Sequence, residues 1–417
     1  MTILETQGLA ARHAERVLAV AGTDQKNRAL EAIAQALKER ESAILAENEK
    51  DLAAARENGM KASLLDRLAL SPQRIDGIVE GVRQVAALPD PIGCVTRMEK
   101  RPNGLVIGRR RVPLGVIGII YEARPNVTVD AAALCLKSGN AVILRGGKEA
   151  FRSNKAFVAV MRDALEAAGL PRDCVALVED TSRASAHELM GLTGYLDVLI
   201  PRGGAGLIRT VVENARVPVI ETGVGVCHVY VDREADLDMG ARIIYNAKTS
   251  RPSVCNAAEC LLIHEQAAEA FLPKAKALLD RKNVELRGCP RTCAILGDGV
   301  KPACAEDWDT EFGDYILAVK VVEDAGEAID FINAHGSGHS EAIVTHSFFT
   351  AQRFLDQVDA AAVYVNASTR FTDGFEFGLG AEIGISTQKM HARGPMGLEE
   401  LTSSKYIVYG TGQVRES

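Results

Sequence analysis

The sequence predicts an α/β protein with two doubly wound α/β domains and a small β flap beside them. Three observations lead to this prediction. From Gly115 to Glu221, short β-branched runs alternate with helical segments, and a second series of the same kind follows from about Cys227. Such alternation is typical of βαβ units that build parallel sheets. The 417 residues are also too many for one ordinary core and enough for two domains.

The ends of the chain have different patterns. Residues 1 to about 90 place apolar side chains at helical spacing, which predicts several amphipathic helices. The turn Pro102-Asn103-Gly104 lies between extended segments and predicts a β-hairpin, whose strand register the sequence does not determine. An exposed hairpin of this kind offers an edge for assembly with other chains. Residues 403–412, SSKYIVYGTG, are β-prone, and we expect them to return as a strand to another part of the assembly.

Composition narrows the partners and the location. With a net charge of −7, the chain lacks the broad basic field that DNA or an anionic membrane surface needs. The longest apolar stretch, residues 112–120, is too short and too broken to span a bilayer, and the N-terminal residues do not resemble a secretory signal. Nine scattered cysteines fit a reducing compartment, so we expect a cytoplasmic protein. Cys289 and Cys293 lack further partners of zinc-site spacing, and no metal is expected.

Two glycine-rich turns follow predicted strands of the first series. The turns contain Arg145, Gly146, Gly147 and Lys148 after AVILR, and Arg202, Gly203 and Gly204 after DVLIP. In parallel sheets, ligands bind at the carboxyl ends of the strands. Cations and exposed backbone N–H groups suit phosphate there, so both turns are candidate phosphate sites. An ordinary solvated glycine turn is the alternative for each.

Three further residues are candidates for chemistry. Cys255 lies between a helical segment and an apolar strand, with Arg251 four residues before it, and positive charge favours a reactive thiolate. Asn126 follows a proline and opens a helix, where its amide either caps that helix or donates to an oxyanion. Glu221 ends a β-branched run in IETGVG, where its carboxylate could act as a base or bind water. A hinge between domains is the alternative for this segment.

Taken in chain order, these motifs resemble the aldehyde dehydrogenase superfamily. The segments are PLGVIGIIYEARPN, SGNAVILRGGKE, IPRGGAGLI, IETGVGVCHVYVD, RPSVCNAAE, EFGDYILAVKVV and VNASTRFTDGFEFGLGAEIGIST. Within that superfamily they are most similar to the γ-glutamyl phosphate reductase family, and the resemblance covers nearly the whole chain. It implies a Rossmann-like cofactor domain, a catalytic domain with a nucleophilic cysteine, and a β-flap that joins copies into a homo-oligomer, a dimer or a tetramer.

The resemblance places these parts on the chain. The cofactor-binding domain is expected at residues 1–98 and 112–224, and the catalytic domain at 225–390. The oligomerisation flap and the C-terminal tail are expected at 99–111 and 391–417. These parts match the segments that the residue patterns indicate.

Single residues also take roles from the resemblance. Cys255 matches the nucleophile, Asn126 the amide of the oxyanion hole, and Glu221 the glutamate that activates water in oxidising relatives. Glu311 matches the glutamate that holds the nicotinamide ribose. Many NAD-preferring relatives place a glutamate on the adenosine ribose where this chain has Lys148. Because a lysine attracts a 2′-phosphate, the expected cofactor is NADPH.

The implied reaction is the second step of proline synthesis from glutamate. L-Glutamyl 5-phosphate is reduced to L-glutamate 5-semialdehyde and phosphate through a thioester on Cys255. The substrate is anionic and needs cations, so Arg124, Arg251 and Arg370 are candidate ligands together with Asn256. Ion pairing within the fold is the alternative for each arginine. Association with glutamate 5-kinase, the preceding enzyme, is a further expectation.

Two other functions remain open. One is an oxidising aldehyde dehydrogenase that hydrolyses its thioester and differs by needing no phosphate. The other is a catalytically silent relative kept for assembly, which would lose nothing when Cys255 is replaced. Glu221 stays unassigned in the reductive direction, because water attack on the thioester would waste the intermediate.

Overall fold

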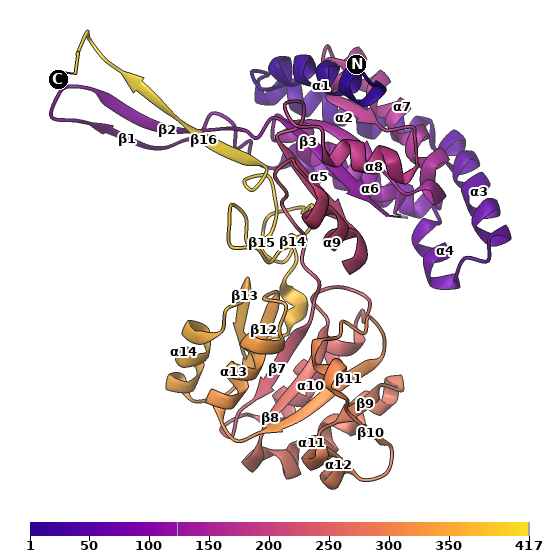
Figure 1. Ribbon diagram of the computed structural model, residues 1–417, viewed down its shortest axis with the longest axis vertical. Helices are drawn as coiled ribbons and strands as arrows, with labels where there is room; N and C mark the ends of the chain where they lie inside the picture. The colour runs from indigo at the N-terminus through magenta and orange to yellow at the C-terminus, as the bar shows by residue number, and fades with distance from the viewer. Residues whose placement is uncertain (123, 416–417) are drawn as a thin grey trace. The chain divides into compact units, whose positions relative to one another are not determined.

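The computed structural model describes residues 1–122 and 124–415, and it divides into two compact units (Figure 1). Unit 1 comprises residues 1–221, 379–384 and 396–417, and unit 2 comprises residues 222–378 and 385–395. The last two residues of the predicted tail, 416–417, lie outside the described residues. Each unit contains a parallel sheet with helices packed on it, which confirms the predicted α/β class. The functional division into cofactor and catalytic domains stays a prediction.

Unit 1 begins with a helical region. Its helices are α1 (Ile3–Leu18), α2 (Thr23–Glu39), α3 (Glu41–Glu57), α4 (Ala62–Leu68) and α5 (Pro72–Ala87). The Thr2 side chain caps α1 and Ser71 caps α5, each accepting a backbone N–H of the first turn. In α2 the buried residues Leu30, Ile33 and Leu37 follow the helical spacing that predicts these helices.

The sheet of unit 1 has four parallel strands in the order β5-β4-β3-β6. Its elements are β3 (Val116–Tyr121), α6 (Pro125–Lys137), β4 (Ala141–Arg145), η1 (Lys148–Ala150), α7 (Phe151–Ala167), η2 (Arg172–Cys174), β5 (Val175–Leu177), α8 (Arg183–Met190), β6 (Val198–Arg202) and α9 (Ala205–Asn214). The β-branched run VPVIE contributes only an isolated bridge between Leu199 and Val219. Pro218 has no N–H to extend a ladder there.

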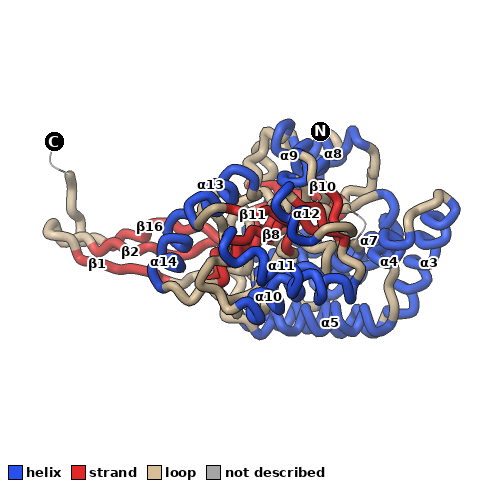
Figure 2. The backbone as a smooth tube through the Cα atoms, turned by 90° about the horizontal axis from the view of Figure 1, so that it is seen from below, coloured by secondary structure: helices blue, strands red, loops and turns tan. Residues whose placement is uncertain are grey.

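A three-stranded antiparallel sheet projects from the rest of unit 1, as the ribbon in Figure 1 shows, and its three strands run side by side in the tube view of Figure 2. It consists of β1 (Val95–Lys100), β2 (Val106–Pro113) and β16 (Thr402–Tyr409). The predicted hairpin is present, because β1 pairs with β2 across the turn that includes Gly104. The β-prone tail pairs with β2 of the same chain, from Thr402 opposite Pro113 to Tyr409 opposite Val106.

The sheet of unit 2 has seven parallel strands in the order β10-β9-β11-β8-β7-β12-β13. Its first elements are β7 (Cys227–Val231), α10 (Leu237–Thr249), β8 (Ala258–His264), α11 (Glu265–Leu279), η3 (Asp280–Lys282), β9 (Glu285–Gly288), α12 (Pro290–Leu296), β10 (Val300–Pro302) and η4 (Ala305–Asp309). The remainder are β11 (Ile316–Val322), α13 (Ala325–His335), β12 (Ser340–Val344), α14 (Phe348–Gln357), β13 (Ala362–Val365) and η5 (Thr369–Phe371). A separate antiparallel pair consists of β14 (Ile385–Ser386) and β15 (Gly394–Pro395).

Both faces of the unit 2 sheet are buried. Successive side chains of a strand point to opposite faces, so Val229 and Val231 pack in one apolar cluster and Tyr230 in another. The first cluster includes side chains of α10 and α11, and the second includes side chains of α13 and α14. The only tryptophan of the chain, Trp308, packs edge-on against Phe331 beside the second cluster. This two-sided burial explains the nearly continuous apolar strands.

None of the described helices combines the length and the apolar character needed to cross a membrane.

Candidate active site

Cys255 lies half-buried in the loop between α10 and β8 of unit 2. Its carbonyl oxygen accepts a hydrogen bond from the thiol of Cys227, with the sulfur 3.1 Å away. A β-carbon built on Gly225 would lie 1.6 Å from the same oxygen, so only glycine permits this approach. The segment that leads into β7 therefore fixes the backbone of the predicted nucleophile.

Asn256 joins this loop to the segment around η5. The residue is buried, and its side-chain N–H group donates to the carbonyl oxygens of Thr372 at 2.9 Å and Arg370 at 3.4 Å. Thr369 in turn donates its hydroxyl to the carbonyl oxygen of Asn256 at 2.7 Å. The amide oxygen of Asn256 is buried without a hydrogen-bond partner among the described residues. Asn256 thus braces the loop, and a substrate contact through this oxygen stays a prediction.

Two of the predicted substrate arginines lie beside the same loop. Arg370 donates from Nε to the hydroxyl of Ser250 at 3.0 Å. Burial lowers the pKa of Arg370, and the neighbouring charge of Arg251 lowers it further, while Cys255 acts in the opposite direction. Arg251 itself is exposed. Unit 2 thus brings two cations close to Cys255, an arrangement that suits an anionic substrate.

Glu311 is connected to the Cys255 loop through Gly225. Burial raises the pKa of Glu311, while a hydrogen bond from the Gly225 N–H and the charge of Lys248 oppose this effect. Lys248 forms a buried ion pair with Glu259 at 2.5 Å, and the N–H of Gly313 donates to Glu259 at 3.2 Å. Sequence patterns gave no sign of this pair, because a lysine in a predicted amphipathic helix is expected at the surface.

Other predicted catalytic residues belong to unit 1. Asn126 is exposed in the first turn of α6, and its side-chain N–H donates to the carboxylate of Asp130 at 2.9 Å. Burial raises the pKa of Asp130 to about 6, although the hydrogen bond from Asn126 opposes this. Arg124 occupies the N-cap of α6, and Glu221 is the last residue before unit 2 begins. The joint action of Asn126, Arg124 and Glu221 with Cys255 stays a prediction.

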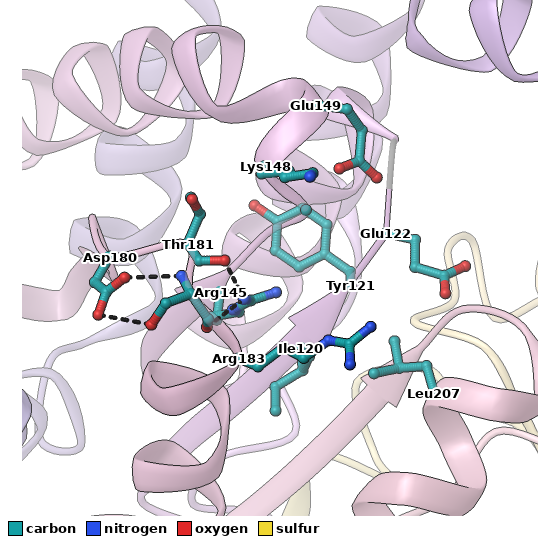
Figure 3. Close-up of a pocket in the computed structure, with 12 residues that line it drawn as sticks. Ile120, Tyr121, Glu122, Arg145, Lys148, Glu149, Asp180, Thr181, Arg183 and Leu207 are labelled. Atoms are coloured by element: carbon teal, nitrogen blue, oxygen red, sulfur yellow. Dashed lines mark hydrogen bonds between the residues drawn. The ribbon is translucent and has the colours of Figure 1, made fainter. Parts of the chain in front are cut away.

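A pocket of about 750 Å³ opens in unit 1 at the carboxyl ends of β3, β4 and β5 (Figure 3). The residues that line it are Ile120, Tyr121, Glu122, Arg145, Gly147, Lys148, Glu149, Asp180, Thr181, Ser182, Arg183 and Leu207. The predicted cofactor residues Arg145, Gly147 and Lys148 are among them, whereas Gly146, Arg202, Gly203 and Gly204 are not. Ligands of doubly wound sheets bind at this end of the strands.

One glycine in each of the two predicted phosphate turns packs closely against a side chain. A β-carbon on Gly146 would lie 2.2 Å from the side-chain nitrogen of Asn154, and one on Gly203 would lie 2.7 Å from the carboxyl carbon of Glu122. The N–H of Gly204, just before α9, donates to the Glu122 carboxylate at 3.0 Å. The N–H of the turn after β6 thus faces a carboxylate of the same unit, and phosphate binding at this turn stays a prediction.

Comparison with known proteins identifies the family. The aldehyde dehydrogenase family model matches residues 5–287 and 302–407. The γ-glutamyl phosphate reductase of Carboxydothermus hydrogenoformans is 64% identical over 405 residues, 97% of each chain. The chain belongs to the γ-glutamyl phosphate reductases of the aldehyde dehydrogenase family. The γ-glutamyl phosphate reductase of Moorella thermoacetica is 62% identical over 413 residues, 99% of each chain.

A solved structure of the same family has the same fold. The crystal structure of the γ-glutamyl phosphate reductase of Thermotoga maritima has a TM-score of 0.98 with this chain at 51% identity, and each chain is covered completely. The predicted resemblance and the aldehyde dehydrogenase-like fold are thus confirmed. Aldehyde dehydrogenases use a nicotinamide cofactor, and the chain is an oxidoreductase.

The unit 1 pocket fits such a cofactor. It places the cations Lys148 and Arg183 at the strand ends where dinucleotides bind. The close approach at Gly146 leaves room only for backbone beside the buried Tyr121 ring. Cations for a phosphate-bearing ligand are therefore present together within one unit.

Proposed function

We propose that this chain reduces L-glutamyl 5-phosphate to L-glutamate 5-semialdehyde and phosphate with NADPH, the second step of proline synthesis from glutamate. The single observation that carries the proposal is the Cys255 loop, a half-buried thiol with Arg251 and Arg370 beside it. Relatives that are 60 to 64% identical along nearly the whole chain have the name that corresponds to this reaction.

Cys255 acts as the nucleophile in the proposed mechanism. Its thiolate attacks the carbonyl carbon of the acyl phosphate, the C–S bond forms, and the C–O bond to phosphate breaks to leave a thioester. A nicotinamide cofactor held by the unit 1 residues would supply the hydride that reduces the thioester carbonyl. Collapse of the resulting thiohemiacetal breaks the C–S bond, returns the thiolate to Cys255 and releases the aldehyde.

Backbone and side-chain donors stabilise the oxyanions on both sides of the thioester. The Asn126 amide and the Cys255 N–H are the proposed donors, and the loss of one such donor typically lowers the rate by about 10² to 10³. Arg251 and Arg370 are the proposed ligands of the substrate carboxylate and phosphate, with Arg124 and Asn256 as further candidates. Glu221 matches the glutamate that activates water in oxidising relatives, and its role in the reductive direction stays unassigned.

NADPH is the proposed cofactor because Lys148 lines the unit 1 pocket where a carboxylate would favour NAD. Arg202, Gly203 and Gly204 are the proposed turn for its pyrophosphate, where Glu122 would give way to the ligand. Glu311 is the proposed ligand of the nicotinamide ribose. A cytoplasmic location and a complex with glutamate 5-kinase remain predictions.

The sheet β1-β2-β16 is the proposed surface for homo-oligomer formation. Large apolar side chains on it are exposed, among them Met98, Tyr406, Val408 and Tyr409. Exposed sheet edges with apolar side chains pair readily with other chains. The predicted flap at 99–111 and 391–417 overlaps these strands.

An assay in the reverse direction tests the proposed reaction. L-Glutamate 5-semialdehyde and NADP⁺ are expected to give NADPH only when inorganic phosphate is present, and the acyl phosphate forms as the second product. Reduction of NADP⁺ that does not depend on phosphate would support the thioester-hydrolysing alternative instead. Mass spectrometry of the enzyme quenched during turnover should detect an acyl group on Cys255.

Two cysteine variants complete the test. Cys255→Ala is expected to lose turnover and the acyl adduct, because no other thiol replaces it. Cys94→Ala removes an exposed thiol from unit 1 and should leave both unchanged. Unchanged turnover in Cys255→Ala would remove this residue from the mechanism and favour a catalytically silent role in assembly.

A further inference from the structure

Three cations line the unit 1 pocket, but one of them is already engaged. The Nη2 group of Arg145 donates to the carbonyl oxygens of Thr181 at 2.8 Å and Ser182 at 2.9 Å. Figure 3 shows these bonds on one side of the pocket. The sequence suggests Arg145 as a phosphate ligand. In the structure its Nη2 group instead forms hydrogen bonds with the loop that follows β5.

The other two cations have no such partners. Among the residues that the structure describes, the side chains of Lys148 and Arg183 form no hydrogen bond or ion pair, and both are exposed to solvent. Arg183 is the first residue of α8 and directly follows the pair that Arg145 holds. In the view of Figure 3, its side chain extends along the pocket toward Leu207, and Lys148 lies on the other side of the Tyr121 ring.

Among the described residues, the carboxylates of the lining form no ion pair with these two cations. Asp180 accepts from the N–H and the hydroxyl of Ser182, at 2.8 Å and 3.0 Å. Both Asp180 and Glu149 interact electrostatically with Arg145, and Glu122 accepts the N–H at the start of α9. The lining thus holds as many carboxylates as cations, but the side chains of Lys148 and Arg183 have no direct hydrogen-bond or ion-pair partner among the described residues. Two cations without partners suit a dianionic phosphate group.

We propose that Arg183 binds the 2′-phosphate of NADPH together with Lys148, and that Arg145 is a positioning residue that holds the Thr181–Ser182 segment in front of Arg183. Lys148 comes from the loop after β4 and Arg183 from the loop after β5, so neighbouring strands supply one ligand each. A guanidinium group donates in a fork that matches phosphate oxygens. The assignment rests on the proposed use of NADPH and adds a second selecting residue to Lys148.

Binding measurements test the assignment without turnover. Titration of the full chain with NADPH and with NADH, followed by the fluorescence of the reduced nicotinamide, gives a Kd for each cofactor. Arg183→Ala is expected to raise the Kd for NADPH about tenfold, the typical effect of one charge-assisted hydrogen bond. The Kd for NADH should change less than about twofold, because NADH has no 2′-phosphate. Adenosine 2′,5′-bisphosphate should displace NADPH from the wild type and less readily from this variant.

A matched control is Arg209→Ala, which removes an exposed arginine of α9 outside the pocket lining. It should change neither Kd. An equal loss of affinity for both cofactors in Arg183→Ala, or no loss, would overturn the assignment. If the wild type bound NADPH and NADH equally well, the proposed preference for NADPH would be wrong. The proposed binding of the 2′-phosphate by Arg183 would then be wrong as well.

A double-mutant cycle tests the positioning role. If Arg145 acts through Arg183, Arg145→Ala should weaken NADPH binding, and adding it to Arg183→Ala should have little further effect. Arg145→Lys should restore part of the affinity, because an ammonium group can still donate to the two carbonyl oxygens. Additive losses in the double variant would show that Arg145 acts independently of Arg183.

Discussion

Gly225 shows how one residue can fix the geometry of a nucleophile. Its N–H donates to Glu311, and its Cα packs against the carbonyl group of Cys255. The backbone of this glycine therefore connects the proposed ribose ligand with the proposed nucleophile inside unit 2. A side chain at this position would disturb both contacts at once.

Gly225→Ala is accordingly expected to lower kcat by about 10²-fold, the typical effect of a misplacement by about 1 Å. The added methyl group must push the Cys255 carbonyl away, while the rest of the sheet stays folded. Steady-state kinetics together with circular dichroism check this outcome. Gly77→Ala in α5 is the control, because its β-carbon meets nothing within 4 Å. A variant at Gly225 with full activity would contradict the role.

At the scale of single residues, the sequence predicts which residues are candidates for function better than it predicts their hydrogen-bond partners. Cys255 and its neighbouring arginines can be found from a motif, because their chemistry depends on residue type. The bonds of Arg145 to two backbone carbonyl groups could not be predicted, since the loop after β5 approaches β4 only in the folded unit. Arg183 carries no motif of its own, and only its place in the pocket distinguishes it from other exposed arginines.

At the scale of elements, β7 and β12 are joined by a buried charged pair. His228 lies opposite Glu341 in the ladder, and its backbone N–H and Nδ1 contact the same carboxylate oxygen at 2.7 Å and 3.0 Å. Burial acts to lower the pKa of His228, but the Glu341 carboxylate and the Cys260 thiol together outweigh it and raise this pKa to about 10. The pKa of His228 is higher in the folded state than in the unfolded chain. The His228–Glu341 pair therefore contributes fully to the free energy of unfolding below a pH of about 6.5, and this contribution is lost as the pH rises through about 10.

Glu341→Ala should therefore lower the free energy of unfolding by about 3 to 5 kcal/mol at neutral pH, since it leaves a buried imidazolium without its partner. Urea denaturation followed by circular dichroism measures this difference, which should shrink as the pH approaches 10. Glu269→Ala, an exposed position on α11, should change stability little. Equal stability of the two variants would show that the pair contributes nothing.

Most elements of both sheets can be predicted from their apolar patterns, but β9 and β10 cannot. The segment ELRG of β9 holds a single large apolar residue, and β10 ends in Pro302 at the edge of the sheet. Short edge strands need few buried side chains, so they leave little periodicity in the sequence. The run VPVIE shows the opposite case: its β-branched residues predict a strand, but the structure has only an isolated bridge there. β-Branched residues alone do not supply a partner strand.

At the scale of the whole molecule, chain length and the alternation of strands and helices predict two α/β parts. They do not predict that the C-terminal segment returns to the first part. Residues 396–417 belong to unit 1 although unit 2 lies between them and residue 221 in the sequence. The pairing of β16 with β2 joins residues about 300 positions apart. Local patterns indicate that both segments are strands and contain no information about which strands pair.

The projecting sheet leads to a prediction about assembly. Tyr406 is 73% exposed on β16, which is unusual for a large aromatic side chain unless another surface covers it. Tyr406→Asp should therefore reduce the mass of the homo-oligomer measured by light scattering at fixed protein concentration. Val20→Ser, which replaces a residue 84% exposed after α1, should leave the mass unchanged. An unaltered mass in Tyr406→Asp would remove this face from the interface.

The single tryptophan has a spectroscopic consequence. Trp308 belongs to unit 2 and packs against Phe331, whereas the pocket at the carboxyl ends of β3, β4 and β5 is lined by residues of unit 1. Indole emission excited selectively will follow the unfolding of unit 2 alone, while far-ultraviolet dichroism averages over both units. Denaturation curves from the two signals will coincide only if the units unfold together, so the native chain already carries the reporter that distinguishes one cooperative transition from two.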